Sequence, residues 1–120
     1  MLLTIVKIYP KAEYRDIVVD VFNSLKGPLG SVTECLECSV TVETDGDSEV
    51  CYMEKWQTRE SLEAHLGSVN FARILQVMEY SIIPPAMNFY VLNEIGGMGL
   101  VENIRLPKLK RGGNQKSPQD

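Results

Sequence analysis

The segment 2–9 is apolar on both of its alternating faces except at Thr4 and Lys7. This pattern predicts a central strand that is covered on both sides and ends at Pro10. Residues 11–26 instead carry apolar side chains at helical spacing, which predicts an amphipathic helix that Gly27-Pro28 stops. Its apolar stripe consists of Tyr14, Ile17, Val18, Val21, Phe22 and Leu25.

A second alternating pattern covers residues 33–43. One face holds Leu36, Cys38, Val40 and Val42, and the other holds Glu37, Ser39, Thr41 and Glu43. Asp45-Gly46 follows, a dipeptide typical of tight hairpin turns. Residues 48–56 continue as the partner strand, so the pattern predicts a β-hairpin.

Two short helices are predicted after the hairpin. Thr58 has the side chain of a helix N-cap and precedes a helix over 59–66. Gly67 breaks this helix, and Ser68 is suited to cap a second helix over 69–80.

A last strand is predicted over 86–95, after Pro84-Pro85. Three glycines at 96, 97 and 99 then mark a bend, and residues 100–106 are expected to continue as an extended arm. The order of elements is the ferredoxin-like βαββαβ arrangement of an α+β domain. It places helices on one face of a four-stranded antiparallel sheet.

The other face of this sheet is expected to carry large apolar groups, namely Tyr52, Trp56 and one side of the last strand. Exposed apolar surface of this kind needs a cover. A second copy of the same sheet is the simplest one. We therefore expect a homodimer.

The length of 120 residues predicts a single domain, 1–106, followed by a basic tail, 107–120. Residues 105–120 contain five basic residues and one acidic residue, whereas the rest of the chain has a net charge of −8. An acidic body does not attract nucleic acid. The polar composition of the tail favours a disordered end over a nucleic-acid-binding arm.

No apolar run is long enough to span a bilayer, and the first residues lack the features of a signal peptide. We therefore expect a cytoplasmic protein without a membrane partner. The three cysteines are expected to be reduced thiols. Cys35 and Cys38 have the spacing of a metal or redox pair, but residues three apart on a regular strand point to opposite faces. Structural thiols are therefore favoured.

The candidate chemistry lies around the second strand of the hairpin. Tyr52, Glu54 and Trp56 share one strand face, and His65, the only histidine, follows on the next helix. An imidazole can act as a base near neutral pH. The alternatives are a buried or capping His65, a Glu54 paired with Lys or Arg, and core aromatics.

The run Glu54-Lys55-Trp56, followed by Leu62-Glu63-Ala64-His65-Leu66-Gly67-Ser68 and Phe71, resembles the antibiotic biosynthesis monooxygenase (ABM) family. The family pattern is a strand ending Glu-x-Trp, then a helix with a His, a Ser three residues later and a Phe. The loop Gly27-Pro28-Leu29-Gly30 also fits, and the resemblance covers about residues 2–95.

The resemblance implies a dimeric α+β barrel. Some members of the family oxidise quinols or polycyclic phenols with molecular oxygen and no cofactor; others degrade haem. We therefore expect a cofactor-independent monooxygenase acting on a small aromatic quinol or phenol, without a metal. The expected catalytic residues are His65 and Glu54, and the expected substrate-binding residues are Tyr52, Trp56, Phe71 and Phe89. The alternative is a non-catalytic ligand-binding or dimerisation protein of the same fold.

Departures from the family pattern argue against haem degradation. Leu75 stands where the haem-degrading branch has an iron-ligating His, and residues 2–9 contain no Asn. His65 falls where that branch has a Trp, and Asn70 replaces a second His that often precedes the Phe.

Overall fold

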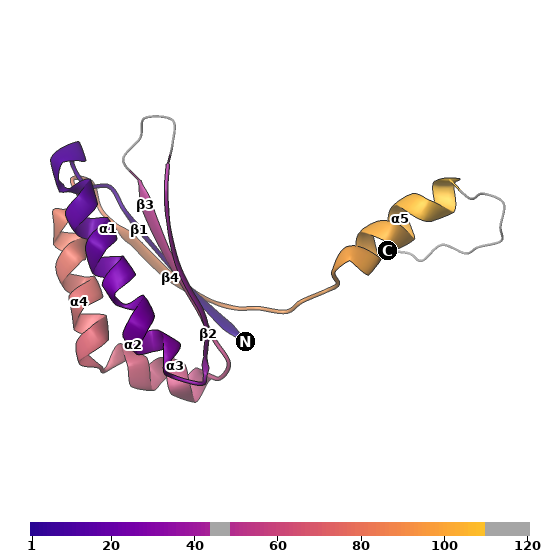
Figure 1. Ribbon diagram of the computed structural model, residues 1–120, viewed down its shortest axis with the longest axis horizontal. Helices are drawn as coiled ribbons and strands as arrows, with labels where there is room; N and C mark the ends of the chain where they lie inside the picture. Colours follow the sequence, from indigo (N-terminus) through magenta and orange to yellow (C-terminus); the bar gives the residue numbers. More distant parts are fainter. Residues whose placement is uncertain (44–48, 110–120) are drawn as a thin grey trace.

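The computed structural model describes residues 1–43 and 49–109. The four strands form one antiparallel sheet in the order β2-β3-β1-β4, with four helices packed on one of its faces (Figure 1). This is the predicted ferredoxin-like α+β fold. The elements are β1 (Leu2–Ile8), η1 (Ala12–Tyr14), α1 (Arg15–Ser24), α2 (Lys26–Gly30), β2 (Cys35–Val42), β3 (Val50–Trp56), α3 (Arg59–Leu66), α4 (Val69–Val77), η2 (Met78–Tyr80), β4 (Ala86–Val91) and α5 (Met98–Leu109).

The central position predicted for the first strand is confirmed, because β1 lies between β3 and β4. The core forms where the sheet meets α1, α2, α3 and α4. The sheet contributes Val6, Ile8, Val50, Tyr52 and Trp56, and the helices contribute Val18, Phe22, Leu29, Leu62, Phe71, Ile74 and Val77. Burial of this apolar surface is the main stabilising contribution to the fold.

The first helical segment does not stop at Gly27-Pro28 as predicted. A short helix, α2, runs through both residues to Gly30. Pro28 is the third residue of α2, and a proline is tolerated in the first helical turn because the N–H that it lacks has no partner there. The extra turn buries Leu29.

The predicted N-caps are confirmed in both later helices. The Thr58 Oγ1 accepts a hydrogen bond from the Ser61 N–H at 3.1 Å and begins α3. The Ser68 Oγ accepts one from the Phe71 N–H at 3.2 Å and begins α4. The Asp45-Gly46 turn lies outside the described residues.

A β-bulge interrupts the alternation predicted for β2. Cys35 pairs with Trp56 and Cys38 pairs with Glu54, so between these two pairs β2 has one residue more than β3. Both cysteines therefore lie on the helix-covered face, while Leu36 is exposed. The expectation that the two thiols point to opposite faces is wrong, because it assumed an unbroken strand. Within the described part of the chain, no group of three or more metal-ligating side chains could hold a metal ion.

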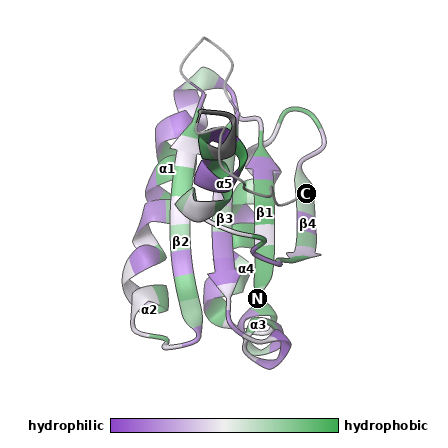
Figure 2. Ribbon diagram, turned by 90° about the vertical axis from the view of Figure 1, so that its right-hand side faces the viewer, coloured by the Kyte–Doolittle hydropathy of each residue, from purple (hydrophilic) through white to green (hydrophobic). Residues whose placement is uncertain are grey.

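Tyr52 and Trp56 do not lie on the uncovered face of the sheet, which corrects a second prediction. Both are buried against the helices. The uncovered face is visible in Figure 2 with the helical layer behind it. Its central rows are Leu3, Ile5 and Lys7 on β1, Cys51, Met53 and Lys55 on β3, and Ala86, Asn88 and Tyr90 on β4. At the β2 edge, Glu37 forms an ion pair with Lys55 at 3.2 Å.

The last strand is shorter than predicted and ends at Val91. The segment expected as an extended arm instead belongs to a helix, α5, which also crosses the expected domain boundary at 106/107. Figure 1 shows α5 away from the sheet, on the side of its uncovered face. None of the described helices is long and apolar enough to cross a membrane.

Candidate active site

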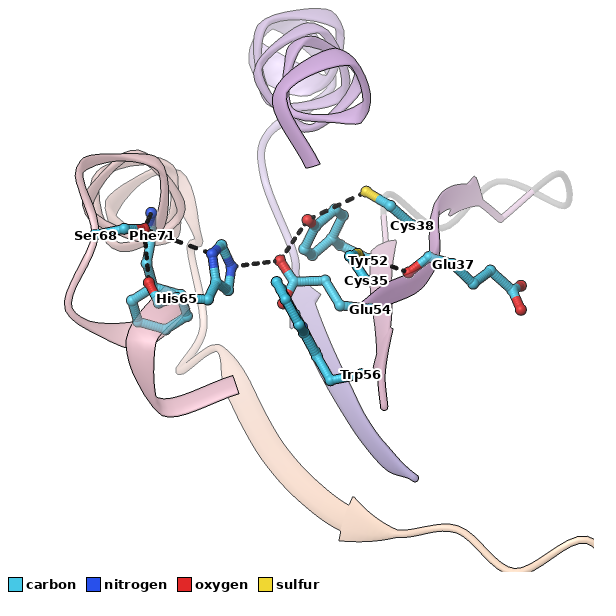
Figure 3. Close-up of polar contacts among 9 residues, drawn as sticks. All are labelled: Cys35, Glu37, Cys38, Tyr52, Glu54, Trp56, His65, Ser68 and Phe71. Atoms are coloured by element: carbon cyan, nitrogen blue, oxygen red, sulfur yellow. Dashed lines mark hydrogen bonds and ion pairs between the residues drawn. The ribbon is translucent and has the colours of Figure 1, made fainter. Parts of the chain in front are cut away.

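A buried pair of ionisable side chains joins β3 to α3. The Nε2 of His65 lies 2.8 Å from the Oε2 of Glu54 (Figure 3). Both side chains are almost fully removed from solvent. Glu54 faces the helices because it alternates with Tyr52 and Trp56 along β3, and His65 lies on the face of α3 that packs on the sheet.

Glu54 accepts hydrogen bonds from three different side chains. Its Oε2 receives the Tyr52 hydroxyl at 2.5 Å in addition to His65, and its Oε1 receives the Trp56 Nε1–H at 2.9 Å. A carboxylate loses several kcal/mol of hydration when it is buried, and charge-assisted hydrogen bonds offset this loss. Two of these donors come from residues adjacent to Glu54 on the same strand face.

Tyr52 lies at the inner end of this network. Its ring stacks on Phe22 with 4.3 Å between ring centroids. Its hydroxyl accepts a hydrogen bond from the Cys38 thiol at 3.3 Å and donates to Glu54. Burial and the negative charge of Glu54 raise the pKa of Tyr52 far above its usual value. The phenol therefore remains a neutral hydrogen-bond donor.

Aromatic side chains fix the orientation of the His65 ring. Trp56 stacks on it at a centroid distance of 4.9 Å, and Phe71 approaches it edge-on at 5.5 Å. The second ring nitrogen, Nδ1, lies 3.5 Å from the Ser68 Oγ. His65 is thus held at one nitrogen by Glu54, on one face by Trp56 and by a T-shaped contact with Phe71.

Ser68, His65 and Glu54 form a line of contacts, although the sequence pointed to Ser68 only as a helix cap and as part of the family pattern. The Ser68 hydroxyl nevertheless has another role. It donates its only proton to the carbonyl of His65 at 2.6 Å and accepts the Phe71 N–H as the cap of α4. A nucleophilic serine must give its proton to the histidine, so this geometry does not favour an acyl-transfer triad.

His65 and Trp56 line a pocket of about 570 Å³ at the end of the sheet. Its walls come from α2, the loop before β2, the end of β3, α3 and the start of α4. The other lining residues are Leu29, Val32, Glu34, Thr58, Glu60, Ser61, Ala64, Ser68 and Asn70. This volume lies within the range of small-molecule sites. Leu29, Val32, Trp56 and Ala64 form the apolar part of the wall, and the other lining side chains are polar.

Comparison with known proteins identifies the family. The family described as antibiotic biosynthesis monooxygenase matches residues 1–77. The chain belongs to this family. No curated protein matches this ABM-family chain.

Solved structures show the same fold. Rv0793 from Mycobacterium tuberculosis is 22% identical with a TM-score of 0.68, and the match covers 79% of this chain and 98% of that one. A structure described as antibiotic biosynthesis monooxygenase is 20% identical with a TM-score of 0.66, covering 78% and 100%. A conserved protein from Methanosarcina mazei Go1 is 20% identical with a TM-score of 0.67, covering 77% and 92%.

The ABM domain does not bring all six predicted site residues to one pocket. His65 and Trp56 line it, and Glu54, Tyr52 and Phe71 lie behind them in contact with the His65–Glu54 network. Phe89 is elsewhere, in a groove of about 250 Å³ between α3 and β4. It lies on β4, the edge strand farthest from the α2–β2 loop that forms part of the pocket wall.

Sequence reasoning missed the pocket wall formed by the α2–β2 loop. Leu29, Val32 and Glu34 line the pocket, yet they precede Trp56 by more than twenty residues in the sequence. No local pattern marks them, because they reach the site only through the pairing of β2 with β3. The Gly27-Pro28-Leu29-Gly30 segment, which the structure places in α2, was a signal for the family alone.

Proposed function

We propose that this ABM-family protein is a cofactor-independent monooxygenase that acts on a small aromatic quinol or phenol. The observation that carries the proposal is the placement of His65. Its Nε2 is held by a buried carboxylate at 2.8 Å, and the same residue lines a pocket with an aromatic wall at Trp56.

In this proposal His65 is the base and Glu54 is the residue that positions it. Glu54 is fully buried, its two oxygens accept three hydrogen bonds, and it is absent from the pocket wall. It therefore has no contact through which to take a proton from a substrate. A buried carboxylate beside an imidazole does fix the tautomer and balance the charge that forms on the ring.

The hydrogen bonds indicate which nitrogen would act. With its Nε2–H donated to Glu54, a neutral His65 has its lone pair on Nδ1. The Ser68 proton is directed to a backbone carbonyl and does not compete for this lone pair. Nδ1 is then available for a phenolic proton.

Deprotonation is the step for which the reaction needs the protein. A phenolate or quinol anion is electron-rich enough to reduce oxygen itself. In the proposed reaction the substrate loses two hydrogens and gains one oxygen atom, and the second oxygen atom leaves as water. All four electrons come from the substrate, so the chain needs to supply a base, an apolar pocket and partial exclusion of water.

Oxygen consumption with a panel of hydroquinones and polyphenols tests the proposal. Wild-type protein should exceed the rate of autoxidation, and His65→Ala should lose about 10²–10⁴-fold of that rate. Added imidazole should restore part of it, because the substitution leaves a ring-sized space beside Glu54. Glu63→Gln, at an exposed position of the same helix, is the matched control and should keep the wild-type rate.

Three results would contradict the assignment. Wild-type turnover in His65→Gln would make His65 a structural residue. An absence of turnover with every phenol and quinol, together with saturable binding of one of them, would favour the alternative, a non-catalytic ligand-binding protein of the same fold. Absence of both turnover and binding would favour a protein that only dimerises.

We also propose that two copies pair through the uncovered sheet face. Leu3, Ile5, Met53 and Tyr90 lie next to one another there, which is an apolar area in need of a cover. A stable pair should bury more than about 1,000 Å². Light scattering at micromolar concentration should give twice 13.5 kDa, and Ile5→Lys should return the chain to monomers. A wild-type monomer would contradict this proposal.

A further inference from the structure

The C-terminal helix α5 lacks a packing partner in the described part of the chain. Figures 1 and 2 show it in front of the uncovered sheet face and separated from it. Residues 92–109 form an arm that includes α5, and several of its large apolar side chains are exposed to solvent. They are Ile95, Met98, Leu100, Val101, Ile104 and Leu106, with exposed fractions from 39% to 81%.

A helix of this kind needs contacts from elsewhere. α5 has 12 residues, and isolated helices shorter than about 12–15 residues are marginal in water. Most helical stability in proteins comes from packing an apolar face. Leu100 and Val101 each lie one turn before Ile104, at i+4 and i+3 spacing, and the three supply such a face, while Glu102 and Asn103 lie on the other side.

The joint between the sheet and α5 has a defined geometry. Gly96 has a φ of 156°, and a Cβ at this position would lie 2.9 Å from the Cβ of Leu100. The Leu100 N–H donates to the Gly97 carbonyl at 2.9 Å at the start of the helix. Only glycine fits at position 96, so this bend sets the direction in which the arm leaves the domain.

The arm is long enough to pass a second sheet. The Leu92 N–H still donates to the Met1 carbonyl, so the arm leaves from the end of the β1–β4 ladder. Residues 92–97 separate β4 from α5 and can span about 20 Å when extended. Sheets packed face to face lie about 10 Å apart. An arm of this length reaches beyond the sheet of a partner that sits on the uncovered face.

We propose that α5 crosses to a second copy of the chain and packs its apolar face there. Charge favours this occupant, because residues 105–120 have five basic residues and one acidic residue, while residues 1–104 have a net charge of −8. The basic end of one chain thus meets the acidic body of the other. The inference rests on the sheet-face dimer proposed above and adds an exchanged arm to it.

Hydrogen exchange of the amides of residues 98–106 in the full-length chain tests the exchange of arms directly. They should be protected at concentrations where the chain is dimeric and lose this protection on dilution to monomers. Protection that persists on dilution would place α5 on its own sheet. An absence of protection in a proven dimer would leave α5 unpacked, and either result overturns the proposal.

A double variant supplies an independent measurement. Val101→Asp with Ile104→Asp should raise the dimer dissociation constant by about tenfold or more, measured by sedimentation equilibrium. Val69→Asp is the matched control, since Val69 is exposed on α4 and should leave the constant unchanged. An unchanged constant in the double variant overturns the arm exchange but leaves the sheet-face dimer intact. A wild-type monomer overturns both, and oxygen consumption tests the proposed activity separately.

Gly96→Ala examines the bend without changing any apolar side chain. The added Cβ would clash with Leu100 and turn the arm, so dimerisation should weaken about as much as in the double variant. Gly97→Ala is its control, because a Cβ there meets nothing within 4 Å. Equal dissociation constants for the two glycine variants would contradict a directed arm.

Discussion

His65 and Glu54 are joined by a buried contact of 2.8 Å, although 11 positions separate them in the chain. Glu54 lies on the helix-covered face of β3, and His65 lies on α3 and lines the pocket. The carboxylate is held in place by its three hydrogen bonds, and the imidazole is the member of the pair that lines the pocket.

Glu54→Gln should lower kcat for a quinol by about 10- to 100-fold and change KM little, because the substitution disturbs the orientation of His65 rather than substrate contacts. An amide cannot accept from Tyr52, Trp56 and His65 together, since one of its two ends is a donor. Steady-state kinetics measure the two constants. A raised KM with an unchanged kcat would mean that Glu54 contacts substrate instead.

Tyr52 should remain protonated at pH 11 in the folded protein. Its pKa is raised by burial, then by the charge of Glu54, from a usual value of 10.0. The tyrosinate absorbance of the native protein at pH 11 should therefore be the same in wild type and Tyr52→Phe. In denaturant at the same pH, the tyrosinate absorbance of the wild type should exceed that of the variant by the contribution of one tyrosine out of five. A difference between the native proteins would contradict the raised pKa.

The same shift makes folding stability depend on pH in a known direction. Below about pH 10 both folded and unfolded chains keep the Tyr52 proton, and above it only the folded chain does. Above about pH 10, Tyr52 should therefore lower the free energy of unfolding by about 1.4 kcal/mol for each further pH unit. Urea unfolding at pH 9 and pH 11 should show a steeper loss in wild type than in Tyr52→Phe. Equal losses would contradict it.

Cys35 should react slowly with a disulfide reagent at pH 8. Burial, followed by the charges of Glu54 and Cys38, raises the pKa of this thiol from 9.0 to about 11. The thiolate fraction falls about a hundredfold, and the higher nucleophilicity of a more basic thiolate offsets about tenfold of this. In Cys38→Ser/Cys51→Ser, where Cys35 is the only cysteine, the folded chain should react about tenfold more slowly than the unfolded one. Equal rates would contradict the shift.

Thr4→Val should stabilise the protein. Thr4 is fully buried opposite Glu54 on β1, and among the described residues its hydroxyl has no hydrogen-bond partner. Replacing an unsatisfied hydroxyl by a methyl group of similar shape should raise the free energy of unfolding by about 1 kcal/mol or more. Thr41→Val, at an exposed position of β2, is the control and should change it by less than about 0.5 kcal/mol. Destabilisation by Thr4→Val would show that the hydroxyl has a partner.

Local periodicity was sufficient for the type and order of most elements. Alternation along residues 50–56 placed Tyr52, Glu54 and Trp56 on one face, and the capping residues Thr58 and Ser68 located the starts of α3 and α4. These features depend on neighbours within a few positions, so the sequence carries them directly. The family pattern around Glu54, Trp56 and His65 has the same local character.

Contacts between distant segments decided the rest. Alternation along a strand does not say which of its two faces the helices cover. In β3 the covered face includes the carboxylate of Glu54, which can be buried there because it accepts three hydrogen bonds. The bulge that places Cys35 and Cys38 on the same side depends on the pairing of β2 with β3. The bend before α5 lies at Gly96, where a Cβ would lie 2.9 Å from the Cβ of Leu100 in the first turn of the helix. In each case the free energy comes from packing and pairing across the fold, which a local pattern does not contain.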